Sequence, residues 1–124
     1  MHGFLAVALA SVPVPIVQTG FLTPSGNIAC NAGHPPGSKR ALLACTVFSA
    51  ASPTRGQRIW SMYADGPVRV GYIVGNAATD LPRLAYGRSW SWRGLRCTSA
   101  AEGLTCRNAA GHGFFLSRGA TRSF

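Results

Sequence analysis

Acidic side chains are scarce in this 124-residue chain, which contains only Asp65, Asp80 and Glu102. Glycoside hydrolysis needs a pair of carboxyl groups at one site, and three acids spread over the chain make such a pair an unfavourable expectation. Lysine is nearly absent too, because Lys39 is the only one among 12 cationic side chains and the others are arginines. The formal net charge is +9. This charge attracts polyanions such as nucleic acid, anionic headgroups or wall polymers. The alternative interpretation is that the charge only keeps the protein soluble.

Several motifs for cofactors and metals are missing as well. Neither Gly-x-Gly-x-x-Gly nor a Walker-type loop is present, so no nucleotide cofactor is predicted. There is no Cys-x-x-Cys pair, and no histidine lies at the usual offset from a cysteine for a zinc site. His34, His112 and the acids have no spacing typical of metal ligands. We therefore predict no cofactor and no metal.

The first residues differ in character from the rest of the chain. Phe4 to Val12 form an uncharged apolar run that is too short to span a bilayer and is followed by Pro13 and Pro15. Such a run is typical of the apolar region of a secretory signal, although no Lys or Arg precedes it. We predict that residues 1–19 are a signal peptide or the remnant of one, and that 20–124 are a single β domain. The alternative is a buried N-terminal strand or helix.

That leader would be cleaved after Ala10 or after Thr19, where the preceding residues suit a signal peptidase. The mature chain would then contain no transmembrane span. We expect it to be secreted or associated with the cell envelope.

The cysteines predict a disulfide framework. There are four in a short chain with a signal-like start, and three pairings are possible in principle. Cys97 and Cys106 flank a polar turn that ends in Gly103, so they would face each other across a hairpin. Cys30 and Cys45 flank a longer loop rich in Gly and Pro. We therefore pair Cys30 with Cys45 and Cys97 with Cys106; zinc is the competing use of these residues.

Short strands with turn residues between them dominate the rest of the pattern, and no segment has a convincing helical stripe. We predict strands at 27–32, 41–48, 57–63, 67–74, 83–86, 94–98, 103–107 and 113–117. On the strand at 67–74, one face would carry Val68, Val70, Tyr72 and Val74. The expected fold is all-β, a small disulfide-bonded β-sandwich or partly open barrel of short antiparallel strands.

The stretch from Tyr86 to Arg93 is the most site-like in the sequence. Trp90 and Trp92 alternate with serines, so both rings would project from one face of a strand together with Arg88. Rings beside a cation suit a sugar or a nucleobase. The alternative interpretation is that both tryptophans are core residues.

His112 is the weak candidate for a catalytic residue, because it lies between two glycines in a setting expected to be exposed. It would act as a base to Ser25, Ser99 or Ser117, with Asp80 orienting it. The alternative is that the glycines form a tight turn that His112 fixes by hydrogen bonds to the backbone.

Two stretches of the sequence together resemble a known family. They are Phe21-Leu22-Thr23-Pro24-Ser25-Gly26-Asn27-Ile28-Ala29-Cys30, and a set that comprises Tyr86 to Trp90, Cys97, Gly103 to Asn108 and Gly111 to Arg118. They are similar to the motifs of small secreted actinobacterial proteins grouped as a domain of unknown function, the DUF6636 type. The resemblance covers Phe21 to Phe124. It implies export, a disulfide-bearing β domain and a place in the envelope or outside the cell, and it implies no reaction.

Together these observations predict a secreted β domain with a binding or structural role and no enzymatic one. Its expected ligand is an anionic or carbohydrate polymer of the cell envelope; nucleic acid stays open as a partner, and the oligomeric state is open too. The alternative function is an exported hydrolase or a nuclease-like toxin that uses His112. The candidate ligand-binding residues are Tyr86, Arg88, Trp90, Trp92, Arg93, Asn108 and His112.

Overall fold

Ten strands make up the computed structural model, which describes residues 12–124. Their bounds are β1 Ile16–Leu22, β2 Ile28–His34, β3 Leu42–Ser52, β4 Gly56–Tyr63, β5 Arg69–Ile73, β6 Ser89–Trp92, β7 Leu95–Ala100, β8 Gly103–Asn108, β9 Gly113–Leu116 and β10 Thr121–Ser123. The first five form one sheet in the order β1-β2-β3-β4-β5, and the last five form a second in the order β10-β9-β8-β7-β6. All neighbouring strands are antiparallel.

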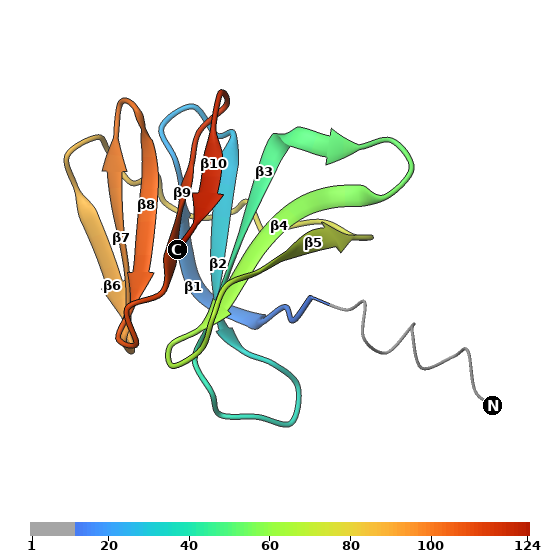
Figure 1. Ribbon diagram of the computed structural model, residues 1–124, viewed down its shortest axis with the longest axis vertical. Coiled ribbons are helices and arrows are strands. Elements are labelled where there is room, and N and C mark those ends of the chain that lie inside the picture. Colours follow the sequence, from blue (N-terminus) through green and yellow to red (C-terminus); the bar gives the residue numbers. More distant parts are fainter. Residues whose placement is uncertain (1–11) are drawn as a thin grey trace.

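The two sheets lie face to face (Figure 1) and neither closes on itself, so the prediction of a small all-β sandwich is confirmed. Alternation along the strands decides which side chains fill the space between them. On β7, Leu95, Cys97 and Ser99 are buried while Arg96 and Thr98 are exposed. The buried cluster between the sheets includes Phe21, Leu43, Cys45, Trp60, Met62, Leu95, Leu104, Phe114 and Leu116. Burying each large apolar side chain is worth about 1.5–3 kcal/mol.

Both predicted disulfides are confirmed, Cys30–Cys45 and Cys97–Cys106. Each joins residues that are direct partners in the strand register, on β2–β3 and on β7–β8. The sulfur atoms of Cys30, Cys45 and Cys106 all lie within 4.8 Å of one another. One disulfide from each sheet therefore meets the other in the middle of the core.

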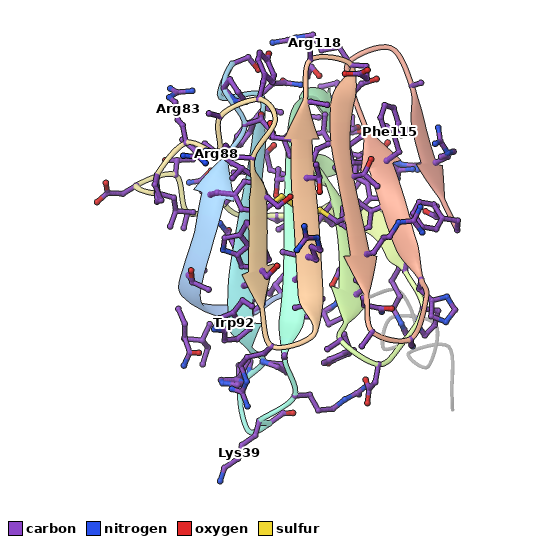
Figure 2. All side chains as sticks on the ribbon, turned by 90° about the vertical axis from the view of Figure 1, so that its left-hand side faces the viewer. Lys39, Arg83, Arg88, Trp92, Phe115 and Arg118 are labelled. Carbon is purple, nitrogen blue, oxygen red and sulfur yellow. A yellow bond between two sulfur atoms is a disulfide. The ribbon has the colours of Figure 1, made fainter. Side chains whose placement is uncertain are left out.

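The outer face of the first sheet is covered by loops. The Asn31 amide exchanges two hydrogen bonds of 3.0 Å with the backbone of Ala78. The Ser61 hydroxyl donates to the carbonyl oxygen of Pro13 at 2.7 Å. As a result the second sheet has the more open outer face, and it faces the viewer in Figure 2.

The predicted strands correspond to β2, β3, β4, β5, β7, β8 and β9, but the strand expected at 83–86 is wrong. This segment belongs to the connection between the sheets and makes only an isolated parallel bridge between Arg83 and Leu22. Pro82 has no N–H for a ladder, and Gly87 turns the chain with a φ of 84°. Of the residues expected on one face at 67–74, Val68 packs against the core cluster, whereas Val70 and Val74 are exposed, Val74 to 94%. β5 is an edge strand, so little packs on it.

β1, β6 and β10 are additional strands. Residues 16–19, which the sequence assigns to a leader, lie in β1 and pair with β2. The apolar run of that leader lies largely outside the described residues. Between residues 12 and 124 no helix has the length and apolar character needed to cross a membrane.

Candidate functional site

A cavity of about 430 Å³ lies at the end of the second sheet where β6 turns into β7. Three arginines from neighbouring segments line it, Arg93 from the turn, Arg96 from β7 and Arg107 from β8. Trp92 and Asn108 also contribute to its wall. We call this the arginine cavity.

Local sequence explains how the arginines come together. Arg93 and Gly94 form a two-residue hairpin turn with φ of 48° and 84°, the positive values of a type I′ turn. This turn places Trp92 opposite Leu95. The register of β7 and β8 then sets Arg96 directly opposite Arg107 on the outer face.

Contacts around Arg93 connect the cavity to the first sheet. Its Nη1 lies 3.1 Å from Nε2 of His34, and its guanidinium carbon lies 5.4 Å from the centre of the Trp92 ring. The His34 Nδ1 lies 3.3 Å from the carbonyl oxygen of Arg40. A proton on Nδ1 and a free Nε2 satisfy both contacts, so we assign His34 the neutral Nδ1–H tautomer.

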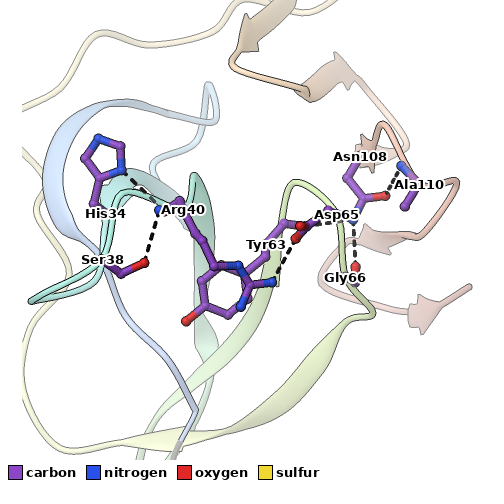
Figure 3. Close-up of polar contacts among 8 residues, drawn as sticks. All are labelled: His34, Ser38, Arg40, Tyr63, Asp65, Gly66, Asn108 and Ala110. Atoms are coloured by element: carbon purple, nitrogen blue, oxygen red, sulfur yellow. Dashed lines mark hydrogen bonds and ion pairs between the residues drawn. The ribbon is translucent and has the colours of Figure 1, made fainter.

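Asp65, on the loop that Asn108 contacts, is already paired with another cation. Arg40 donates to Asp65 at 2.8 Å (Figure 3), which lowers the pKa of the Asp65 carboxyl and raises the pKa of Arg40. The chain has only two other acids, Asp80 and Glu102, and neither lines the cavity. No carboxylate side chain therefore opposes the arginine cavity.

Asn108 has a structural task at this end of the sandwich. Its Nδ2 donates to the carbonyl oxygens of Tyr63 and Gly66 at 2.8 and 2.7 Å, and its Oδ1 accepts from the backbone N–H of Ala110 (Figure 3). The same oxygen also accepts from the backbone N–H of His112. Two donors and two acceptor positions are all that an amide has. The Asn108 side chain is therefore fully engaged within the protein.

The structure separates the other candidates. Trp90 faces the core, with its ring 5.4 Å from that of Phe21, so the interpretation of Trp90 as a core residue holds. Trp92 also packs against the core but reaches the arginine cavity. Tyr86 and Arg88 lie near the opposite end; in Figure 2 Arg88 and Trp92 are well separated along the sheet.

The catalytic arrangement around His112 is not assembled. His112 follows the Asn108 end of β8, whereas Ser99 and Ser117 lie at the other end, where Ser99 pairs with Leu104. Ser25, Ser99 and Ser117 line one cavity there, and His112 does not. Within residues 12–124 the hydrogen bonds of His112 are those of its backbone with Asn108. The glycine-flanked turn is thus fixed by Asn108, and the His112 ring takes no part.

The three clustered cysteine sulfurs have the proximity of metal ligands, yet each already belongs to a disulfide. No thiol is free among the described residues, which include all four cysteines.

Comparison with known protein families finds a match for the second half of the chain. Residues 64–124, which include β5 to β10, match the family model of DUF6636, a family of unknown function. The chain is DUF6636-like. The resemblance expected from Phe21 onward is thereby confirmed over residues 64–124, and the motif from Phe21 to Cys30 lies outside the match. No curated protein and no solved structure matches the chain.

Every residue that lines the arginine cavity lies within the DUF6636-like region. Of the residues singled out in the sequence, the cavity brings together Trp92, Arg93 and Asn108. Arg96 and Arg107 were missed. The sequence did contain a signal for this pair. Cys97 and Cys106 point inward and fix the register of β7 and β8, so the residues next to them, Arg96 and Arg107, must point outward and lie opposite each other.

Proposed function

We propose that this protein binds an anionic polymer of the cell envelope, one that repeats phosphate or carboxylate groups, through the arginine cavity and the outer face of its second sheet. The observation that carries the proposal is the unopposed grouping of Arg93, Arg96 and Arg107. Guanidinium groups bind phosphate and carboxylate with paired hydrogen bonds.

The register makes this grouping costly without a ligand. Arg96 and Arg107 are direct partners on adjacent strands, and like charges in that position destabilise a sheet. Their side chains lean apart, Arg96 toward Ser91 on β6 and Arg107 toward the Phe124 ring, so an anionic chain laid across the strands would contact each guanidinium in turn. Arg122 on β10 extends the same basic face, and all three side chains are exposed.

The aromatic rings favour contacts with anionic groups over base or sugar stacking. Phe124 and Phe115 lie on this side of the sheet, but Arg107 and Arg122 already cover them, with guanidinium carbons 4.5 and 4.8 Å from the ring centres. Trp90 is turned into the core. A bound polymer would therefore meet guanidiniums and strand hydroxyls, and few open ring faces.

Two features support a place outside the cytoplasm as part of this proposal. Both disulfides are in the core, and structural disulfides persist in oxidising compartments. The apolar run before Pro13 is typical of an export signal.

A binding titration with inorganic polyphosphate tests the proposal. The triple variant Arg93→Gln, Arg96→Gln and Arg107→Gln should bind polyphosphate much more weakly. The slope of log affinity against log salt should also become shallower by about 2 to 3, because three fewer phosphates are neutralised and fewer counterions are released on binding. The control is a charge-matched triple variant at exposed cations elsewhere, Lys39→Gln, Arg55→Gln and Arg69→Gln. It should leave most of the affinity intact.

Equal losses in the two triple variants would mean that binding depends on net charge alone, and the proposed site would be wrong. Polygalacturonate, single-stranded DNA and neutral dextran complete the titration. Absence of binding to both polyphosphate and polygalacturonate at low salt would refute the proposal. If single-stranded DNA bound more tightly, and its affinity depended on the bases, the ligand would be nucleic acid and not an envelope polymer.

A further inference from the structure

A second cavity, of about 390 Å³, opens at the opposite end of the sandwich. Its walls come from the β1–β2, β7–β8 and β9–β10 turns together with Tyr86. In Figure 2 Arg118, which lines it, lies at one end of the sheet and Trp92 of the arginine cavity lies toward the other. We call it the turn cavity, and its volume falls in the lower part of the range for small-molecule sites.

Ser99 is the most informative residue of the turn cavity. It is an inward position of β7, only 1% exposed, and it lines the cavity. Within residues 12–124 its hydroxyl has no hydrogen bond to the protein. By contrast, the Ser117 hydroxyl donates to the carbonyl oxygen of Ala120 at 3.0 Å, and Ser25 accepts from the Asn27 backbone at 3.2 Å. The Ser99 hydroxyl is not among the fully buried polar atoms left without a partner in the described residues, so it reaches the cavity surface, where a ligand can hydrogen-bond it.

The turn cavity also carries one charge of each sign. Glu102 lies on the β7–β8 turn and Arg118 on the β9–β10 turn. In the described part of the chain the one ion pair joins Arg40 and Asp65, so Glu102 and Arg118 are free to pair with a ligand. In a chain with 12 cations and three acids, an unpaired carboxylate beside a cavity is notable.

The remaining surface is apolar and held in place. Ile28, Leu104 and Leu116 form buried parts of the lining, and the Tyr86 ring stands beside them, 55% exposed. The wall at the β1–β2 turn is fixed by Arg83, whose Nη1 donates to the carbonyl oxygens of Thr23 and Pro24 at 3.3 and 2.7 Å. A wall fixed in advance lowers the entropy cost of binding.

We propose that the turn cavity binds a small zwitterion of dipeptide size with short apolar side chains. The ligand carboxylate pairs with Arg118 and its ammonium group with Glu102. The Ser99 hydroxyl hydrogen-bonds the peptide group, and the side chains contact Leu104 and Leu116. This site is separate from the arginine cavity and does not depend on the polymer-binding proposal.

Titration of the isotope-labelled protein with L-alanyl-L-alanine, followed by NMR, tests this site. Saturable shifts should appear at residues of the three turns. Ser99→Ala, Glu102→Gln and Arg118→Gln should each weaken binding, the two charge variants by about ten-fold to a hundred-fold, as expected for hydrogen bonds to charged groups. Glu102 and Arg118 are exposed, so their variants keep the fold even if Ser99→Ala disturbs the core.

Arg122→Gln is the matched control, because it removes the same charge from an exposed position outside the turn cavity. It should bind the dipeptide as the unchanged protein does, and so should the Arg93, Arg96 and Arg107 triple variant. Absence of saturable shifts at millimolar dipeptide would overturn the proposal. So would equal binding of an N-acetylated, C-amidated dipeptide, which lacks both charges.

Discussion

Asn108 joins the two sheets through a single side-chain amide. Its donors reach Tyr63 at the end of β4 and Gly66 in the loop that follows, and its acceptor oxygen holds the β8–β9 turn of the second sheet. The residue is buried, so water cannot replace these partners. Its position beside Arg107 means that the same amide also fixes one wall of the arginine cavity.

Replacing Asn108 by Ala should therefore destabilise the protein. Four hydrogen bonds are lost and their backbone partners become unsatisfied, so we expect the free energy of unfolding to fall by about 3 kcal/mol. Urea denaturation measures this change. Ser117→Ala is the control, since it removes the hydrogen bonds of an exposed turn, and it should cost less than about 1 kcal/mol. Similar losses in the two variants would contradict the role given to Asn108.

At the residue scale the sequence predicts spacing better than direction. The alternation of Trp90 and Trp92 with serines is a strand pattern, and both do lie on β6 with their rings on one side. Which side faces the core depends on Phe21 and His34, which contact these rings from the first sheet. Those contacts span more than 50 residues of sequence, so local patterns cannot supply them.

At the element scale, the predictable parts are those with local partners. The Cys97–Cys106 hairpin needs only a turn and two short strands, and Cys30–Cys45 repeats this over a longer loop. β10 pairs with only three residues of β9 and is fully exposed, so it carries almost no apolar pattern. β1 was hidden because its first residues continue the apolar start of the chain.

The disulfides set the stability of the two central hairpins. Changing Cys97 and Cys106 together to Ala should lower the free energy of unfolding by about 3 kcal/mol, because the unfolded chain regains the entropy of the closed loop. Urea denaturation under non-reducing conditions measures the loss. The neighbouring outward pair, Thr98→Ala with Thr105→Ala, is the control and should cost under about 1 kcal/mol. If the cysteine variant matched the threonine variant, the disulfide would have no stabilising role.

At the scale of the whole molecule, charge is arranged unevenly between the two ends of the sandwich. The arginine cavity has cations alone, whereas the turn cavity has one free charge of each sign. Net charge follows from composition, but this arrangement follows from register and turns that join distant segments. The two ends therefore suit different ligands, a polyanion at one and a zwitterion at the other.

The repulsion within the arginine cavity should be measurable as lost stability. Arg96→Gln removes one of two like charges carried by directly paired residues and gives up only a 3.4 Å contact with Ser91. At about 10 mM salt, where the screening length is about 30 Å, we expect the variant to be more stable than the unchanged protein by about 0.2–1 kcal/mol. At about 150 mM salt the length falls to about 8 Å and the gain should shrink.

Thermal unfolding at the two salt concentrations checks this expectation. Arg69→Gln is the control, because Arg69 is also exposed on a strand but pairs with Ser61, and its stability should not change. A less stable Arg96→Gln protein at low salt would mean that Arg96 supports the fold. A more stable one that also binds polyphosphate weakly would mean that the chain keeps Arg96 at a cost to its own stability, as expected for a residue retained for its ligand.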